Sequence, residues 1–357
     1  MGMTSIESVQ KRKTREFPFL CVDDFTKDIF HARALEAAFE IGIIDYLLTV
    51  GNVTVDAFWE ACKGEDRALH LLLNLLIGNN VVRRHERQIM LTDDFKKALR
   101  FRDLLEIRLQ IASLAAHDVI DYFSDLVMNR DAFMRKARFI GLFAYDRCYG
   151  SREEDYRLTR QWMRITTVLT KYEAEVCMQY VDFGQYRRIL DIGGNSGEFV
   201  LQICKKNPDI QAVVYDLPMV CEVGMNHVRS ETEFGRIAFM KGNALTDDIP
   251  DGFDLIIFKS MLHDWPDREV SLLIEKAGRS LRSGGSLLIF ERQHIDGDET
   301  TLPYAIMPFL LFFHCFRSPS VYEKQLEANG FQDIETRRID LEMPFLMVTG
   351  RKGAEEA

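Results

Sequence analysis

Short apolar runs alternate with amphipathic stretches along the second half of the chain. From Arg187 onward, segments with helical spacing separate five strand candidates, at 188–192, 211–216, 236–240, 253–258 and 285–291. Alternation of this kind predicts a parallel α/β sheet. Two last candidates, 333–339 and 345–350, are joined by a short turn, which requires an antiparallel pair. The pattern predicts a mostly parallel, Rossmann-like sheet of seven strands that ends in an antiparallel hairpin.

The N-terminal hundred residues show helical spacing instead. Apolar residues recur three and four positions apart over 26–48, where Gly42 is expected to divide two helices, and again over 67–77. Two short apolar segments, 81–83 and 88–91, flank a charged turn and predict a β-hairpin. Helices followed by such a hairpin form a winged-helix unit. We expect a structural role for it, because the candidate recognition helix carries leucines rather than base-contacting residues.

Residues 103–182 are nearly all helical in pattern, with one polar interruption at 147–154. The stretch is too long and too apolar for a simple linker, so we expect it to pack over the sheet and close one side of a pocket. The chain is therefore expected to divide into a winged-helix part, 1–102, a helical connector, 103–182, and an α/β domain, 183–357.

The turn after the first predicted strand carries three closely spaced glycines: Gly193, Gly194 and Gly197. A strand, a glycine turn and a helix present backbone N–H groups and the positive end of a helix to a nucleotide-like ligand. The loop does not fit the dinucleotide-binding pattern G-x-G-x-x-G, because Asn195 and Glu198 stand where that pattern requires glycine. Asp216 ends the next strand, where a carboxylate can bind both hydroxyls of a ribose. Together these features resemble the S-adenosylmethionine site of a methyltransferase.

A histidine and an acid, His263 and Asp264, follow the fourth predicted strand. Ligands of open α/β sheets lie beyond the carboxyl ends of the strands, so His263 is expected on the rim of the site. An imidazole with an ordinary pKa of about 6.5 can remove a proton from a phenol or an enol. Glu291 ends the fifth predicted strand and can orient that imidazole. This position favours a catalytic role over that of an ordinary surface or core histidine.

Composition narrows the class of protein. The 45 basic and 55 acidic residues give a net charge of −10, which argues against a nucleic-acid-binding protein with a basic face. Seven scattered cysteines indicate neither a disulfide framework nor a zinc site, and no residue pair suggests any other metal site. We find no signal-peptide core and no apolar run long enough to span a bilayer, so we expect a cytoplasmic protein without membrane insertion.

Three motifs, in this order, are similar to those of one known family. They are Leu190-Asp-Ile-Gly-Gly-Asn-Ser-Gly197, Tyr215-Asp-Leu-Pro218 and Leu262-His-Asp-Trp-Pro-Asp267. They resemble the plant caffeic acid/acetylserotonin type of small-molecule O-methyltransferase, with its bacterial and fungal relatives in secondary metabolism. The likeness covers nearly the whole chain, because residues 26–100 resemble the winged helix through which that family dimerises. It implies a homodimer with S-adenosylmethionine as cofactor and S-adenosylhomocysteine as product.

The resemblance also implies roles for individual residues. His263 matches the general base, Glu291 matches the first of two glutamates that flank it, and Asp264 belongs to the same motif. The residues expected to hold the cofactor are Asp191, Gly193, Gly194, Gly197, Asp216, Leu217, Asn243, Ala244, Lys259 and Thr167. The residues expected to line the acceptor site are Trp162, Met163, Met261, Phe309, Phe312, Phe313, His314 and Phe316.

Two positions depart from the family pattern. Asn243 stands where an acidic residue usually meets the adenine edge, and an amide can still bond there. Phe316 replaces the second glutamate, just before Arg317, so the base loses one of two usual partners. A phenylalanine beside His263 is expected to lower the pKa of that histidine. His314 lies in an aromatic stretch, predicted to be helical, that also contains Phe309, Phe312, Phe313 and Phe316. It is a candidate second base or a hydrogen-bond donor to the acceptor.

The sequence therefore predicts methyl transfer from S-adenosylmethionine to a hydroxyl of a large, flat aromatic or polycyclic molecule. The change at Phe316 keeps an alternative open: a relative of the same fold that methylates carbon or nitrogen, or uses the cofactor without methylation. A winged-helix regulator with a ligand-binding domain is a second alternative, opposed by the acidic charge and by the pair of His263 and Glu291. The glycine spacing and the terminal hairpin oppose an NAD oxidoreductase.

Overall fold

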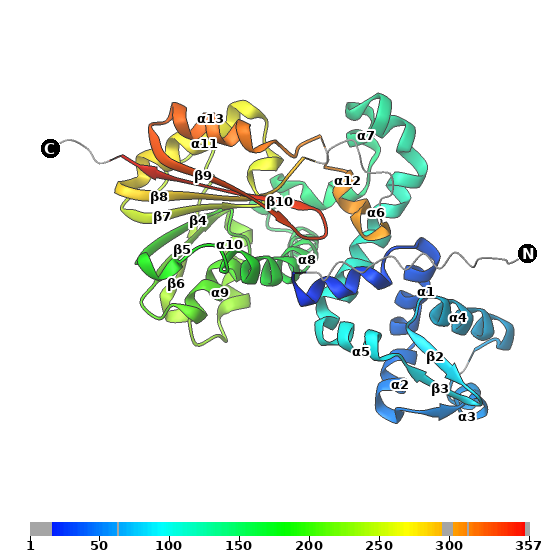
Figure 1. The fold of residues 1–357 in the computed structure, drawn as a ribbon. Helices are drawn as coiled ribbons and strands as arrows, with labels where there is room; N and C mark the ends of the chain where they lie inside the picture. Colours follow the sequence, from blue (N-terminus) through cyan, green and yellow to red (C-terminus); the bar gives the residue numbers. More distant parts are fainter. Residues whose placement is uncertain (1–15, 63, 295–302, 313, 354–357) are drawn as a thin grey trace, which may run out of the picture.

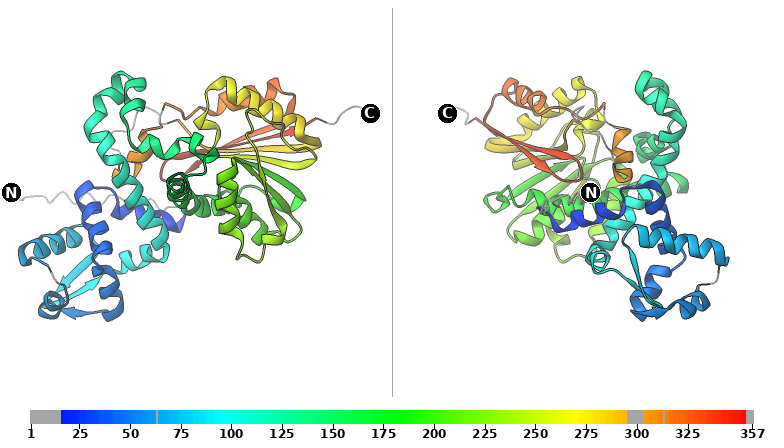
Figure 2. Two further views of the ribbon diagram at one scale, coloured as in Figure 1. Left: turned by 180° about the vertical axis from the view of Figure 1, so that it is seen from behind. Right: turned by 45° about the vertical axis from the view of Figure 1, so that its right-hand side comes forward.

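The computed structural model describes residues 16–62, 64–294, 303–312 and 314–353. In Figure 1 an α/β part with a large twisted sheet lies beside a smaller N-terminal part. The long helices α6 (Arg102–Met128) and α8 (Glu153–Cys177) run between the two parts. Figure 2 shows the same arrangement from two further directions. Within the described ranges, no helix combines the length and the apolarity needed to cross a bilayer.

The large sheet has the strand order β6-β5-β4-β7-β8-β10-β9. Its strands are β4 (Arg188–Ile192), β5 (Gln211–Asp216), β6 (Ile237–Lys241), β7 (Phe253–Lys259), β8 (Leu281–Arg292), β9 (Phe331–Asp340) and β10 (Pro344–Lys352). The pairs among β4 to β8 are parallel, and β10 is antiparallel to both β8 and β9. This confirms the predicted seven-stranded Rossmann-like sheet with its terminal antiparallel hairpin. β8 begins earlier than predicted, because the register between β7 and β8 shifts after Phe253 and lets Leu281 join the ladder.

Alternate residues of the central strands face two separate cores. In β7, Leu255 and Ile257 belong to the core on the side of α9 (Glu198–Lys206) and α10 (Pro218–Val228). Ile256 and Phe258 belong to the core on the side of α11 (Asp267–Ser280) and α13 (Pro319–Ala328). A parallel strand that is buried on both faces needs a continuous apolar run, which is the pattern seen in the sequence. The helices leave the carboxyl ends of the strands accessible to a ligand.

The N-terminal part contains short helices and a small antiparallel sheet of order β1-β3-β2. Its elements are η1 (Pro18–Phe25), α1 (Ile29–Glu40), α2 (Ile43–Val50), β1 (Val53–Thr54), α3 (Val55–Ala61), α4 (Asp66–Gly78), β2 (Val82–His85), β3 (Gln88–Leu91) and α5 (Asp93–Ala98). Gly42 divides α1 from α2 as predicted, with a positive φ of 78° that glycine adopts without strain. The predicted hairpin is β2 and β3. The two-residue strand β1 is too short to leave a periodic signal.

The helical connector is interrupted over a longer stretch than predicted. Between α7 (Arg130–Lys136) and α8, the chain forms two 3-10 turns, η3 (Phe139–Phe143) and η4 (Tyr145–Tyr149), rather than a helix up to residue 147. The buried carboxylate of Asp118 accepts the backbone N–H groups of Arg138 and Phe139, at 2.9 and 2.7 Å, and holds the chain out of the helical path. Shorter elements complete the fold: η2 (Leu99–Phe101), η5 (Phe183–Gln185), η6 (Phe234–Arg236), η7 (Leu262–Asp264), η8 (Tyr304–Ile306) and α12 (Met307–Leu310).

Candidate active site

A cavity lies beyond the carboxyl ends of β4, β5, β6 and β7, where an open α/β sheet binds its ligands. α8 and the turns η3 and η4 contribute one wall, and α12 with the segment after it contributes another. Most residues predicted from the sequence line this cavity. They are Trp162, Asp191, Gly193, Gly194, Asp216, Leu217, Asn243, Ala244, Lys259, Met261, His263, Asp264, Phe309, Phe312 and Phe316. The fold therefore brings the predicted cofactor residues and the predicted base into one space.

Two predicted residues of the cofactor site lie elsewhere. Gly197 begins α9 with a φ of +76°, and a Cβ there would lie 2.9 Å from the ring of Phe239, so it serves the turn and the packing of the helix. Thr167 does not line the cavity, because successive residues of a helix point about 100° apart. Thr166 lines it instead, and its hydroxyl donates to Oδ1 of Asn195 at 3.1 Å.

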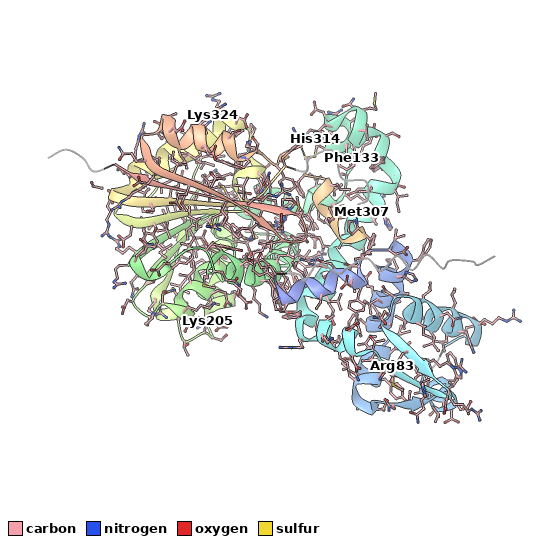
Figure 3. The ribbon with its side chains drawn as sticks, viewed as in Figure 1. Arg83, Phe133, Lys205, Met307, His314 and Lys324 are labelled. Atoms are coloured by element: carbon pink, nitrogen blue, oxygen red, sulfur yellow. The ribbon has the colours of Figure 1, made fainter. Side chains whose placement is uncertain are left out.

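Two predicted acceptor-site residues, Met163 and His314, do not line the cavity either. Met163 is buried in a separate cluster with Met219 and Val220, so it supports the wall without lining it. His314 is exposed and lies 3.5 Å from the backbone carbonyl of Leu126 in α6, outside the cavity (Figure 3). The aromatic segment is helical only over α12, so it does not present one continuous face. The predicted contact at Phe313 lies outside the described residues.

Two residues of the glycine loop, Gly193 and Asn195, have positive φ angles. At Gly193, φ is +69°, and a Cβ would lie 2.6 Å from Cγ of Met261, so only glycine fits. Asn195 also has a positive φ, 54°, which is uncommon for a residue with a side chain. The carboxylate of Asp216 stabilises this turn by accepting the backbone N–H of Asn195 at 2.8 Å. The loop therefore exposes backbone to the cavity.

Two acids stand beside this loop, the buried Asp191 and the partly buried Asp216. Asp216 accepts the backbone N–H groups of Leu217 and Asn195, and each of its oxygens keeps a lone pair for a ligand. Burial raises the pKa of Asp216 to about 6, although these two hydrogen bonds oppose the rise. Burial also raises the pKa of Asp191 to about 8, against the charge of Lys259. Oδ2 of Asp191 has no partner among the described residues.

These observations fit S-adenosylmethionine. An unpaired carboxyl oxygen on Asp191 suits an ammonium group, and two acceptor oxygens on Asp216 suit the hydroxyls of a ribose. A loop that has no room for a side chain at Gly193 lets a ligand approach the backbone closely. Asn243 and Ala244, beyond the end of β6, line the same cavity.

The predicted base is held by a fully bonded carboxylate. Oε2 of Glu291 lies 2.7 Å from Nδ1 of His263, and its Oε1 accepts the backbone N–H groups of Met261 and Leu262, each at 2.7 Å. Glu291 itself is completely buried and does not line the cavity. Since Glu291 occupies Nδ1, the second ring nitrogen of His263 is the one left for a ligand. That atom, Nε2, lies 3.5 Å from Oδ1 of Asp264.

The lowering of the pKa of His263 that the neighbouring Phe316 predicts is outweighed by other groups. The ring of Phe316 does lie 5.4 Å from the imidazole, and burial by itself lowers the pKa of His263. The negative charges of Glu291 and Asp264 outweigh burial, so the pKa of His263 is raised above its ordinary value. The aromatic neighbour favours a lower pKa, and the charge of Asp264, the next residue in the chain, adds to that of Glu291 in opposing it.

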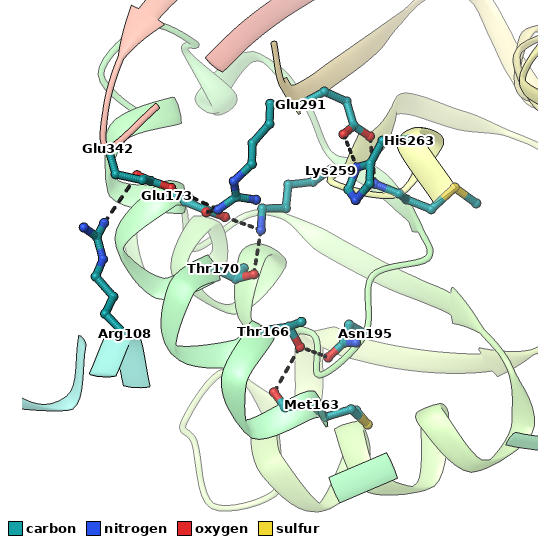
Figure 4. Close-up of polar contacts among 12 residues, drawn as sticks. Arg108, Met163, Thr166, Thr170, Glu173, Asn195, Lys259, His263, Glu291 and Glu342 are labelled. Atoms are coloured by element: carbon teal, nitrogen blue, oxygen red, sulfur yellow. Dashed lines mark hydrogen bonds and ion pairs between the residues drawn. The ribbon is translucent and has the colours of Figure 1, made fainter. Parts of the chain in front are cut away.

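Lys259, which was predicted to hold the cofactor, is not a free cation. Its ammonium donates to Oγ1 of Thr170 at 2.7 Å and pairs with the buried carboxylate of Glu173 (Figure 4). Glu173 also accepts from Arg292 at 2.6 Å. The charges of Lys259 and Arg292 outweigh burial and lower the pKa of Glu173. Lys259 and Arg292 thus share the carboxylate of Glu173 at the cavity wall.

The same cluster continues away from the cavity. Arg292 pairs with Glu342 at 3.1 Å, Glu342 pairs with Arg108 of α6 at 3.3 Å, and Arg108 pairs with Asp23 of η1. We call these residues, with Lys259 and Glu173, the buried ion cluster. Charges of alternating sign offset the cost of taking each ion out of water. The cluster joins the N-terminal part, α8 and the sheet.

Several residues that line the cavity were missed. They are Tyr145, Thr166, Thr170, Glu173 and Arg292. α8 did carry a signal, because Trp162, Thr166, Thr170 and Glu173 recur at spacings of three and four and so share one face. Tyr145 gave none, since its hydrogen-bond partner Asp264 is 119 residues away in the sequence.

The strand order, the terminal hairpin and the glycine loop define the class of S-adenosylmethionine-dependent methyltransferases. Residues 123–332 match the model of the O-methyltransferase domain family, and the chain belongs to this family. This confirms the predicted family, methyltransferase class and cofactor, and the predicted fold agrees with it.

Among its relatives is acetylserotonin O-methyltransferase of Bos taurus, 32% identical over 191 residues, which cover 52% of this chain and 54% of the relative. A 3-hydroxy-5-methyl-1-naphthoate 3-O-methyltransferase of Streptomyces sahachiroi is 30% identical over 139 residues, 39% of this chain and 40% of that protein. The N,N-dimethyltransferase OxyT of Streptomyces rimosus is 28% identical over 197 residues, 54% and 56% of the two chains. The chain thus matches about half, or less, of the length of these relatives.

Solved structures agree in fold. Human N-acetylserotonin methyltransferase in complex with S-adenosylmethionine superposes with a TM-score of 0.71 at 20% identity, over 96% of this chain and 99% of that one. The mitomycin 7-O-methyltransferase MmcR gives a TM-score of 0.68 at 20% identity, over 90% and 94%. At this level of identity the likeness establishes the fold alone.

Proposed function

We propose that this protein transfers a methyl group from S-adenosylmethionine to a hydroxyl of an aromatic small molecule, with His263 as general base. The observation that carries this proposal is that His263, held by Glu291 at 2.7 Å, lines the same cavity as the glycine loop and Asp216. When bound there, S-adenosylmethionine supplies an electrophilic methyl group on a sulfonium sulfur. Much of the rate would then come from holding the acceptor in line with that methyl group.

The residues around the glycine loop would hold the cofactor. Asp216 would accept the ribose hydroxyls, and the unpaired oxygen of Asp191 would accept from the ammonium group. Asn243 would meet the adenine edge. Lys259 would add little net charge beside the sulfonium, because Glu173 neutralises it.

His263 would take the acceptor's proton on Nε2. The imidazolium that forms would lie between Glu291, at 2.7 Å, and Asp264, at 3.5 Å, and both carboxylates would stabilise its charge. The pKa of His263 is raised, so the neutral form that can accept a proton predominates only above that raised pKa. The activity is therefore expected to rise with pH through this ionisation.

The shape of the cavity favours a flat, apolar acceptor. Its wall near the base is aromatic, and its members are Phe139, Phe143, Trp162, Trp265, Phe309, Phe312 and Phe316. Faces and edges of aromatic rings pack well against another ring system. The names of two relatives specify aromatic acceptors, acetylserotonin and a hydroxynaphthoate.

A second candidate is methylation of nitrogen or carbon in the same cavity. The apolar Phe316 beside the base favours it, because an amine or an activated ring carbon needs less help from a charged second partner. The name of one relative specifies an N,N-dimethyltransferase, and the name of another an L-tyrosine C(3)-methyltransferase. The product distinguishes these cases, and release of no S-adenosylhomocysteine would identify a relative that does not methylate.

We also infer that the chain forms a homodimer through its N-terminal helices, and that residues 1–102, 103–182 and 183–357 are its three functional parts. Several large apolar side chains of α1, α4 and α6 are exposed, which supports a covered surface. They are Phe30, Leu71, Ile120, Phe123, Val127 and Met128. The mass of the protein in solution, measured by light scattering, would test this state.

The function is tested by incubating the protein with S-adenosylmethionine and a panel of phenols, naphthols and aromatic amines, with mass detection of both products. We expect S-adenosylhomocysteine and an O-methylated ring. His263→Ala should lower the rate by about 10² to 10⁴, the usual range for loss of a general base. His314→Ala is the matched control, because His314 lies outside the cavity. Unchanged turnover in His263→Ala would refute the assignment of the base.

A further inference from the structure

Tyr145 and His263 lie on opposite sides of one carboxylate. The hydroxyl of Tyr145 donates to Oδ2 of Asp264 at 2.5 Å, and the other oxygen of Asp264 lies 3.5 Å from Nε2 of His263. Glu291 binds the far side of the imidazole at 2.7 Å. Four side chains from η4, η7 and β8 therefore form a continuous polar series in an otherwise aromatic wall.

Tyr145 is itself held firmly in place. Its ring packs against Trp162 and Trp265, with centroids 5.5 and 6.0 Å away. Two residues along, Arg147 donates to the carbonyl of Gly141 at 2.8 Å and fixes the turn that carries the tyrosine. Burial, followed by the charge of Asp264, raises the pKa of Tyr145 well above its usual value, so the phenol keeps its proton and donates.

Asp264, which accepts the hydrogen bond of Tyr145, is placed to act as a second carboxylate for His263. The ring of Phe316 lies 5.4 Å from the imidazole and can give His263 no charge. Asp264 stands on the Nε2 side instead. At 3.5 Å it is too far for a strong hydrogen bond, so Nε2 keeps its lone pair for an acceptor hydroxyl, yet the charge is close enough to stabilise an imidazolium.

We propose that Tyr145 is a positioning residue: its hydrogen bond holds Asp264 as the second carboxylate of His263, beside Glu291. This role rests on the proposed function, in which His263 removes the acceptor's proton. The proton goes to Nε2, and Nδ1–H remains donated to Glu291. Tyr145 and Asp264 exchange no proton in this step.

Other charged and titratable groups also face this series. Glu291 and Arg292 face His263 from β8, Glu291 also faces Asp264, and Asp216 faces Tyr145 from the end of β5. Cys148 of η4 lies near Tyr145, and Cys315 lies near Asp264. The variants below leave all of these groups unchanged, so differences between variants report on the tyrosine and its partner.

The proposal predicts a specific change in Tyr145→Phe. Without the hydroxyl, the charged form of Asp264 loses a stabilising hydrogen bond, and less negative charge then faces His263. The pKa of His263 should fall by about 0.5 to 1 unit, and kcat/KM should fall about tenfold, in keeping with one lost hydrogen bond to a charged group. The rising limb of the pH profile should move to lower pH. Asp264→Asn should shift it in the same direction and further.

The control is Tyr156→Phe. Tyr156 packs against the same cluster as Tyr145, with Trp162 and Met163, but does not line the cavity. It loses the same hydroxyl and should leave the titration of His263 and the pH profile unchanged. A merely structural role of Tyr145 would lower the melting temperature and the yield but would not move the ionisation of His263.

The decisive measurement is an NMR titration of histidine-labelled protein, with the His263 signal assigned by its loss in His263→Gln. It needs no acceptor, so it separates this inference from the proposed function. A lower pKa of His263 in Tyr145→Phe supports the positioning role, even if no methylated product is found. An unchanged pKa overturns it, even if the wild-type protein methylates an acceptor.

Discussion

The carboxylate of Asp216, at the end of β5, accepts the backbone N–H of Asn195, in the loop after β4, at 2.8 Å. The two residues belong to neighbouring parallel strands, and the bond fixes a positive φ of 54° at Asn195. One side chain therefore shapes the glycine loop and also offers lone pairs to a ligand. In the proposed function, the same group would both stabilise the loop and bind the ribose of the cofactor.

Asp216→Ala should therefore weaken cofactor binding strongly, for two reasons that act together. The ribose hydroxyls lose their acceptor, and the turn at Asn195 loses the bond that holds it. We expect the Kd of S-adenosylmethionine, measured by calorimetry, to rise by about 100-fold or more, since each charged hydrogen bond contributes about 1.5–3 kcal/mol. Asp251→Ala, on an exposed loop before β7, is the control. Binding of wild-type strength in Asp216→Ala would mean that the loop has been misinterpreted.

The raised pKa of Asp191 predicts that binding of the cofactor releases a proton. Burial raises the pKa of Asp191 to about 8, so much of this group is protonated at pH 7. An ammonium group beside its unpaired oxygen would favour the charged form and lower that pKa, so a proton must leave. Calorimetry at pH 7 in two buffers with different ionisation enthalpies should give different binding enthalpies. The difference should shrink in Asp191→Asn, and equal enthalpies in the wild-type protein would contradict the prediction.

The fold could be predicted because it depends on short-range patterns. The buried strands appear as apolar runs, and the short turn between 340 and 344 leaves β9 and β10 only an antiparallel pairing. The turns at 139–149 could not be predicted in this way. Their apolar residues fit a helix, and the group that diverts the chain is Asp118, about 20 residues earlier.

The site was predictable where a motif places a residue at the carboxyl end of a strand or within a few residues beyond it. His263, Asp216 and Gly193 all follow this rule. Thr167 missed by one position, because the rotation of a helix cannot be fixed to a single residue without knowing what it faces. The buried ion cluster was beyond reach, since Arg108 and Glu342 lie 234 residues apart and neither has a local signal.

Restoring the missing glutamate should show how much of its role Asp264 has taken over. In Phe316→Glu, a third carboxylate would lie near His263, where the phenyl ring is now 5.4 Å away. The pKa of His263 should rise further, so the rising limb of the pH profile should move to higher pH. Phe316→Leu, which keeps the site apolar, should leave the limb in place. A limb that stays fixed in Phe316→Glu would show that this position does not face the base.

The buried ion cluster predicts a large cost for removing its central carboxylate. Glu173 pairs with both Lys259 and Arg292 and is almost completely buried, so Glu173→Gln would leave two buried cations short of a partner. Breaking such a pair typically costs about 3–5 kcal/mol of the free energy of unfolding. Glu175→Gln, an exposed position on the same helix, should change it by less than about 0.5 kcal/mol. Urea unfolding followed by circular dichroism measures both.

Because Glu173 holds its charge through a lowered pKa, this stability should be present at neutral pH and be lost as the pH falls through that pKa. Equal stability of the two variants would mean that Lys259 and Arg292 find other partners or water.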